Sequence, residues 1–107
     1  MNIKQELEYA RGMVERRRDI ANAINAAESA REAKENHRSV LGALKEVLKH
    51  RKNIMSLVDD TTAGYALEVE QLLGTVNVWR EQSALVLAGW GVPENELRLI
   101  EQQVGGL

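Results

Sequence analysis

The chain has 107 residues, of which 44 % are apolar and 28 % charged, with one Pro and no Cys. This length supports one compact domain over residues 1–107, and the composition excludes a disordered chain, disulfides, thiolate zinc sites and cysteine nucleophiles. The first residues are charged and no run of about 18 apolar residues occurs. The sequence therefore predicts a cytoplasmic protein that does not enter a membrane.

Charge is unevenly distributed along the chain. Residues 1–58 contain 12 Lys and Arg against 8 Asp and Glu, a net charge of +4, whereas residues 59–107 contain 2 against 8, a net charge of −6. We expect either that the two halves attract each other, within a bundle or between subunits, or that the basic half faces an anion.

The first predicted helix starts at Asn2, which forms a capping-box pattern with Gln5. Apolar residues follow at three- and four-residue steps to Ala33, which makes a helix of roughly 33 residues. Its expected weak points, where the helix would bend, are Gly12 and Asn22.

The strongest pattern in the chain is that of residues 39–58, SVLGALKEVLKHRKNIMSLV. The apolar residues form three adjacent columns on one helical face, which predicts a helix covered by others. The apolar stripe loses its phase near residues 35–37 and Ser39 is a suitable cap, so we predict a helix break there. The alternative is one continuous rod from Ile3 to Val58, about 84 Å long, that would need a partner chain.

Residues 59–62 are rich in capping side chains and predict the start of a third helix, which ends at Gly89 with a left-handed cap. The inward stripe of this helix is predicted to contain Tyr65, Val69, Leu72, Val76, Trp79, Ser83 and Val86. Pro93 then suits the first turn of a short last helix, which Gly105 stops.

These elements predict an all-α protein, a bundle of three long helices plus a short C-terminal helix. The first helix is expected to extend past the central one, at roughly 19 residues, by about 21 Å. Because three apolar columns exceed what one neighbouring helix covers, we expect the bundle to self-associate, with coiled-coil-like packing, as a homodimer or a larger homo-oligomer.

Residues typical of catalysis or metal binding are sparse. His37 and His50 lie among Lys and Arg and are expected to be solvated. Glu32 and Glu35 form a Glu-x-x-Glu that resembles one motif of the helical Mg-dependent nucleotide pyrophosphohydrolases, but the second motif of that family, Glu-x-x-Asp, is missing. We therefore expect no enzyme, no cofactor and no metal; a helical enzyme that uses these four residues is the weakest alternative.

Residues 84–102 have the outline of a helix-turn-helix with Gly91 in the turn. The second helix would carry three Glu against one Arg, and phosphates repel such a face. We expect a simple turn that packs the last helix.

A protein partner is expected at Trp90, Val92 and Trp79, since glycines flank Trp90 and Trp is enriched among residues that dominate binding energy. The alternative is that Trp90 folds back over Val86 and Leu97.

A second group of candidates is basic. The residues expected to bind an anion are Arg16, Arg17, Arg18, Lys45, Lys49 and Lys52. Arg17 and Arg51 lie on apolar stripes, so the alternative for them is pairing with acids of the third helix. The candidate acids are Glu68, Glu70 and Glu81.

The leading hypothesis is a small, non-enzymatic accessory protein that acts as a homo-oligomer through protein–protein contacts, as an inhibitor or adaptor from a phage or mobile element. The alternative is an anion-binding module for nucleic acid or a nucleotide, which would use the basic N-terminal half.

Overall fold

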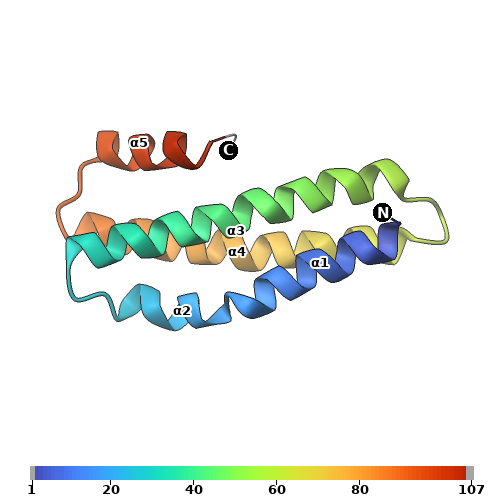
Figure 1. Cartoon of the computed structure of the whole chain (residues 1–107), viewed down its shortest axis with the longest axis horizontal. Helices are drawn as coiled ribbons and strands as arrows, with labels where there is room; N and C mark the ends of the chain where they lie inside the picture. Colours follow the sequence, from blue (N-terminus) through green and yellow to red (C-terminus); the bar gives the residue numbers. More distant parts are fainter. Residues whose placement is uncertain (1, 106–107) are drawn as a thin grey trace.

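The computed structural model describes residues 2–105, which form five helices and no strand. The helices are α1 (Ile3–Arg16), α2 (Arg18–Asn25), α3 (Ala30–Leu57), α4 (Ala63–Gly89) and α5 (Glu94–Val104). The pair α1–α2, α3 and α4 run along the long axis of a molecule of 48 × 24 × 18 Å, and α5 lies beside α3 (Figure 1). The predicted all-α bundle of three long helices plus a short C-terminal helix is confirmed.

α1 begins with the predicted capping box. The side-chain oxygen of Asn2 accepts a hydrogen bond from the backbone N–H of Gln5 at 2.9 Å, and the side-chain oxygen of Gln5 accepts one from the backbone N–H of Asn2 at 3.1 Å. These bonds satisfy donors that the helix end would leave free.

The prediction of a bend at Gly12 or Asn22 is wrong, because the first helix is interrupted at Arg17. The N–H of Arg17 donates to the carbonyl of Val14, three residues back, and its backbone leaves the helical region (φ −108°, ψ 9°). Its guanidinium donates to the carbonyl and hydroxyl oxygens of Ser39 on α3, at 3.2 and 3.0 Å. A contact with another helix therefore accompanies the bend, and helix propensity does not indicate it, since Arg is a good helix former.

The predicted helix break at residues 35–37 is also wrong, and so is the continuous rod. The chain turns at residues 26–29, and α3 starts directly after Ser29, whose hydroxyl oxygen accepts a hydrogen bond from the N–H of Glu32 at 3.1 Å. The apolar stripe is interrupted at residues 35–37 because His37, a polar residue, occupies an inward position of an unbroken helix.

Because the helix break lies at residues 26–29 and not at residues 35–37, the helix lengths differ from those expected. α3 has 28 residues and α4 has 27, whereas α1 and α2 have 14 and 8. The first helix therefore does not extend past the central one, and the expected overhang of about 21 Å does not exist.

The core lies between α1, α2, α3 and α4, and residues 39–58 are at its centre, as predicted. The buried apolar residues of this segment are Val40, Leu41, Ala43, Leu44, Val47 and Ile54. A smaller cluster near the start of α3 combines Ala33 with Leu87 and Val92. Neighbouring helices of the same chain thus cover most of the width of the central helix.

The turn between α3 and α4 is held by Asp59, as the capping pattern predicts. Its carboxylate accepts hydrogen bonds from the N–H groups of Thr61 and Thr62, at 2.8 and 3.1 Å, and from both hydroxyls. These bonds lower the pKa of Asp59, the hydroxyl of Thr61 contributing most. They position the chain for α4 to start at Ala63.

α4 ends at Gly89, as predicted, but the left-handed residue is Gly91 (φ 77°), while Gly89 stays helical. The N–H of Val92 donates to the carbonyl of Leu87 at 3.0 Å, which closes the turn.

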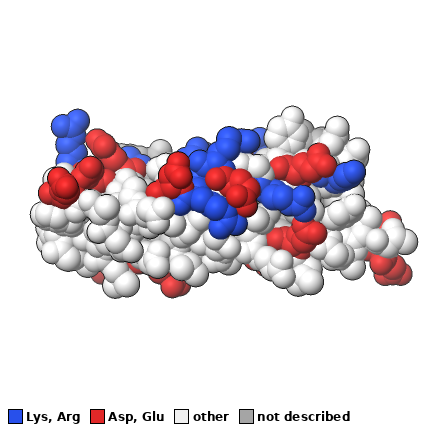
Figure 2. Space-filling view, turned by 90° about the horizontal axis from the view of Figure 1, so that it is seen from below, with Lys and Arg blue, Asp and Glu red and all other residues white. Residues whose placement is uncertain are grey.

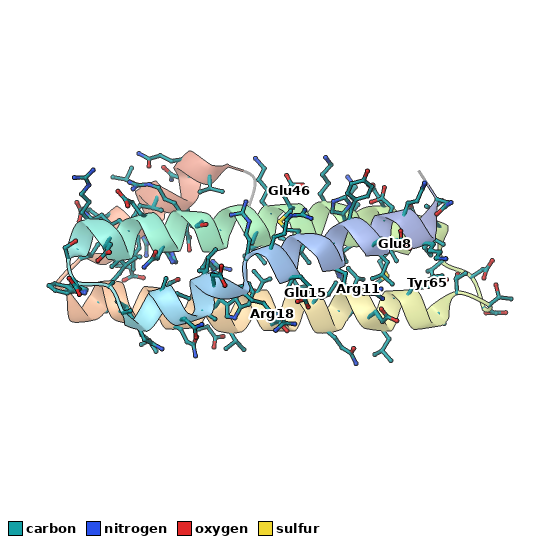
Figure 3. The ribbon with its side chains drawn as sticks, turned by 60° about the horizontal axis from the view of Figure 1, so that its bottom comes forward. Glu8, Arg11, Glu15, Arg18, Glu46 and Tyr65 are labelled. Carbon is teal, nitrogen blue, oxygen red and sulfur yellow. The ribbon has the colours of Figure 1, made fainter. Side chains whose placement is uncertain are left out.

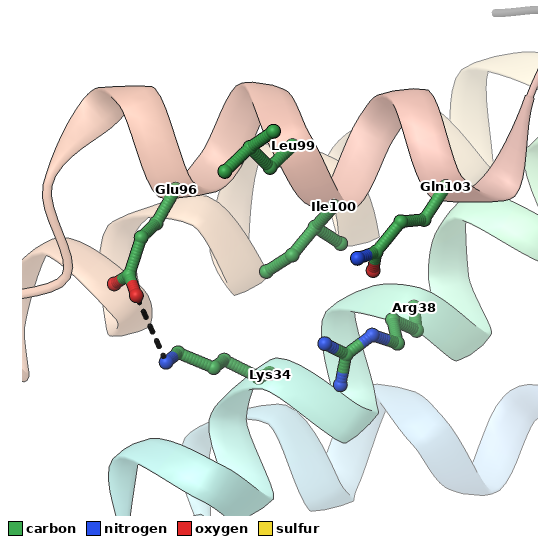
Figure 4. A pocket seen from close by; sticks show the side chains of 6 residues that line it. All are labelled: Lys34, Arg38, Glu96, Leu99, Ile100 and Gln103. Carbon is green, nitrogen blue, oxygen red and sulfur yellow. Dashed lines mark ion pairs between the residues drawn. The ribbon is translucent and has the colours of Figure 1, made fainter.

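α5 packs against α3. Lys34 pairs with Glu96 at 3.6 Å across a small hollow between the two helices, and Ile100 is buried beneath it (Figure 4). α5 runs back along the bundle, as expected of a simple packing turn (Figure 1). This packing does not match a helix-turn-helix, in which the second helix crosses the first at a steep angle.

Candidate functional site

α4 has an exposed row of residues opposite its buried face. The buried face carries Val69, Val76, Trp79, Ser83 and Leu87. The exposed row, which we call the α4 seam, consists of Leu67, Gln71, Gly74, Val78, Glu81 and Leu85, at alternating four- and three-residue steps. Leu67, Val78 and Leu85 are 63 %, 51 % and 73 % exposed, and Glu81 is the one charged residue of the seam. The solvent side of a bundle helix normally carries polar residues, so this face is a candidate interaction surface.

The neighbouring helices carry a different surface. Figure 2 shows the side formed by α1 and α2, where Lys and Arg are interleaved with Asp and Glu, whereas the lower margin, along which α4 runs, is mostly uncharged. The margin along α4 therefore differs from the rest of this view because it carries few charged residues.

Gly74 lies in the middle of the α4 seam, where residues 2–105 leave open space for a side chain. Its φ is not positive, and a Cβ added there would meet no atom within 4 Å. Gly in a helix interior is less stable than Ala by about 1 kcal/mol. Contacts within the chain do not account for this residue.

The sequence prediction for this helix missed the α4 seam. It considered only the inward stripe from Tyr65 to Val86 and not the opposite face, on which Leu85 is exposed. The signal that indicates the seam is the second four–three repeat that starts at Leu67.

Among the three residues predicted to contact a partner, only Trp90 is exposed. It follows α4 directly and is 46 % exposed, so it does not fold back over the end of the bundle. Trp79 and Val92 are 5 % and 8 % exposed and are covered by their own chain. Neither side chain is available to a partner without unfolding.

The predicted anion-binding residues differ in their surroundings. Arg17 bonds to Ser39, Arg18 pairs with Glu15 at 3.0 Å, and the ammonium of Lys45 donates to the carbonyl of Val104 at 3.1 Å. The other three are exposed and form no ion pair within residues 2–105: Arg16, Lys49 and Lys52.

The expected attraction between the basic and acidic halves is confirmed within the chain. Three ion pairs join the halves: Arg11–Glu68, Arg51–Glu70 and Lys34–Glu96. The expectation of an acidic partner is confirmed for Arg51, whereas Arg17 contacts Ser39 instead.

Two arginines line a groove between α1 and α4. Figure 3 shows Arg11 and Glu15 on α1 and Arg18 at the start of α2, and these residues border the groove together with Glu68 on α4. Each Arg is paired with a Glu, so the groove is electrically balanced.

The expectation that both histidines are solvated is wrong. His37 is 1 % exposed, and its Nδ1 atom lies 2.5 Å from the hydroxyl oxygen of Ser83, which is 2 % exposed. The hydroxyl of Ser83 donates to the carbonyl of Arg80 at 3.0 Å. Since a hydroxyl has one hydrogen, we assign the ring proton of His37 to Nδ1, where it donates to Ser83.

This assignment leaves the Nε2 atom of His37 as a buried acceptor without a partner. Burial lowers the pKa of His37, Glu101 opposes that shift, and the positive charge of Arg80 adds to it. The contact between His37 and Ser83 resembles that of a Ser–His catalytic dyad. Both side chains are buried, however, so a substrate cannot reach them. The arrangement supports a structural role.

His50 is held in a second buried polar cluster. Its Nδ1 atom donates to the carboxylate of Glu6 at 2.5 Å, and the amide of Asn53 donates to the other carboxylate oxygen at 3.2 Å. The ring of Tyr9 stacks on His50, with the centroids 6.1 Å apart. The hydrogen bonds from His50, which contributes most, and from Asn53 lower the pKa of Glu6, while burial opposes the shift.

Glu32 and Glu35 take part in local contacts of α3. Glu32 accepts a hydrogen bond from the N–H of Glu28 at 2.7 Å, and Glu35 pairs with Arg31 at 3.3 Å. Within residues 2–105, no three His, Asp or Glu side chains lie close enough to hold a metal ion together.

Comparisons with protein families, with curated proteins and with solved structures find no match to this chain. None of the helices described is both long enough and apolar enough to cross a membrane.

Proposed function

We propose that this chain is a non-enzymatic interaction protein that acts in the cytoplasm as a homo-oligomer and binds other proteins through the outer face of α4. The observation that supports this function is the α4 seam, with Leu67, Val78 and Leu85 each at least half exposed. Exposed apolar rows of this kind are typical of protein–protein contact sites. An accessory role, as an adaptor or inhibitor, fits a chain whose distinguishing feature is a binding face.

Trp90 extends the candidate surface beyond the end of α4. An exposed Trp contributes a large apolar ring with one polar N–H group, and such residues often dominate binding energy. We therefore include Trp90 as a second contact, separate from the α4 seam.

The test compares Val78→Arg with Leu99→Arg. Both replace exposed apolar residues, at 51 % and 54 % exposure, but Leu99 lies on α5 outside the α4 seam. Each protein is analysed by sedimentation equilibrium and used as bait in an extract of the native host. We expect V78R to lose self-association or a captured protein that wild type and L99R retain. If V78R matches L99R in both assays, the proposed function is wrong.

A second candidate function is anion binding through α3. Lys45, Lys49 and Lys52 are spaced by four and three residues and are all exposed, which places them on one helical face. Phosphate contacts release counterions, so binding of a nucleic acid should weaken linearly in log salt, with a slope of about −0.9 for each phosphate neutralised. The double variant K49E/K52E should reduce that slope by about 2. A mobility shift that is insensitive to salt would exclude this function.

A further inference from the structure

We infer that the first partner of the α4 seam is a second copy of this chain, bound with the two α4 helices antiparallel about a two-fold axis that crosses the seam between Gly74 and Val78, at the level of Val76 along the helix. This inference rests on the proposed function and specifies its homo-oligomer. The pairs of seam residues equidistant from Val76 are Gly74 with Val78, Gln71 with Glu81, and Leu67 with Leu85. In an antiparallel pair of helices with this symmetry, the two members of each pair share one layer of the interface.

The sizes of the paired residues are complementary in this register. Leu67 of one copy meets Leu85 of the other at both ends of the seam. Near the axis, Val78 of each copy packs over Gly74 of the other, where the structure has open space. A residue without a side chain lets two helices approach to about 8 Å between axes. In the dimer, the open space at Gly74 accommodates the side chain of Val78.

Charge favours the antiparallel arrangement over the parallel one. In the antiparallel register the carboxylate of Glu81 shares a layer with the amide of Gln71, which can donate a hydrogen bond to it. The two Glu81 residues then lie about 15 Å apart along the axis, farther than the screening length at physiological salt. In a parallel pair the same carboxylates would lie side by side in the interface, where like charges repel.

The size of the seam sets the strength of the contact. A helix of 27 residues is about 40 Å long and 10–12 Å wide with its side chains, which makes a footprint of roughly 400 Å² on each copy. Stable complexes bury about 800 Å² on each partner, so a reversible dimer that forms at micromolar or higher concentration is expected.

The test uses cysteines in a chain that has none of its own. Facing residues of two closely packed helices have Cα atoms within the 7 Å or so that a disulfide spans. We expect L67C/L85C to form a covalent dimer on mild oxidation. The single variants L67C and L85C should not, since each residue lies about 27 Å along the axis from its own copy. The control is L99C, which replaces an exposed leucine on α5 and measures the rate of cross-linking by random collision.

The expected result is cross-linking of L67C/L85C about tenfold faster than of L99C, because associated chains raise the effective thiol concentration. Preferential cross-linking of L67C alone would show a parallel pair; it would overturn the register while leaving the seam as an interaction surface. A wild type that stays monomeric at several hundred micromolar, with all variants at the L99C rate, would overturn the dimer. Loss of a captured protein in V78R would in that case still support the proposed function, so the two failures are distinguishable.

Discussion

The Nδ1 atom of His37 on α3 lies 2.5 Å from the hydroxyl oxygen of Ser83 on α4, and both residues are buried. The contact joins the two longest helices of the bundle through a polar group placed in an apolar interior. With the ring proton on Nδ1, the opposite nitrogen of His37 is a hydrogen-bond acceptor. It is buried and has no donor near it among residues 2–105. The cost of such an unsatisfied group rises further if the ring gains a second proton and becomes charged.

The stability of the protein should fall as the pH drops below about 6.5, owing to His37. Its pKa in the folded state is lowered from 6.5, chiefly by burial, so the unfolded chain binds this proton at higher pH than the folded one. The stability that neutral His37 contributes is therefore complete above about pH 6.5 and is lost as the pH falls through the folded-state pKa, at up to about 1.4 kcal/mol per pH unit. Urea unfolding between about pH 7 and pH 5 measures this slope.

The matched variant for this measurement is His37→Gln, which keeps a side-chain amide able to donate to Ser83 but does not titrate. Its free energy of unfolding should change less with pH than that of wild type over this range. Equal pH slopes in both proteins would show that His37 does not control the pH dependence.

Glu6 should control stability in a lower pH range. Its folded-state pKa is lowered from 4.5, first by the hydrogen bond from His50, so the stability contributed by its carboxylate is present above about pH 4.5 and lost as the pH falls through the folded-state pKa. Replacing Glu6 with Gln should lower the free energy of unfolding at pH 7 by about 1–3 kcal/mol, since the buried hydrogen bond from His50 then has a neutral amide instead of a carboxylate as its acceptor. The control is Glu8→Gln, at an exposed position of the same helix, which should leave stability almost unchanged.

Gly74→Ala should raise the free energy of unfolding of the single chain by about 0.5–1 kcal/mol, measured at low protein concentration. A Cβ at this position meets no atom, and Ala has the higher helix propensity. Gly91→Ala should act in the opposite direction, because Gly91 has φ 77° and an L-residue is strained there. Two changes of the same sign would contradict the conformations described for α4 and its C-terminal turn.

The two tryptophans should differ sharply in their effect on folding. Trp79 is 5 % exposed within the core, so Trp79→Ala should cost about 3–5 kcal/mol through the cavity that it leaves. Trp90 is 46 % exposed, and Trp90→Ala should change the free energy of unfolding by no more than about 0.5 kcal/mol. A large loss of stability in W90A would mean that Trp90 closes the bundle end after all.

Much of the fold could be predicted because its signals are local. The capping box at Asn2, the hydrogen-bonded turn at Asp59 and the end of α4 at Gly89 each depend on residues within a few positions of one another. Apolar residues at helical spacing likewise indicated the central helix and its burial. Residue type and spacing suffice for such features, because backbone hydrogen bonds and one buried stripe decide them.

The features that were predicted wrongly depend on contacts between distant segments. Arg17 interrupts the first helix where it contacts Ser39, and His37 belongs to the interior, where the hydroxyl oxygen of Ser83 accepts a hydrogen bond from its ring. The sequence of α3 shows a histidine among charged residues, which is what a solvated position also looks like. Only the partner on another helix distinguishes the two cases.

The amino-acid sequence by itself determined that this protein is helical, where most of its helix ends lie and which stripe of the central helix is buried. Those properties follow from local hydrogen bonding and the helical repeat. The tertiary structure alone decided that both histidines are interior and that the row from Leu67 to Leu85 faces outward, opposite the stripe that α4 buries. α4 is apolar on both faces, so its pattern does not say which face packs inward. The neighbouring helices make that choice by covering one face and leaving the other exposed.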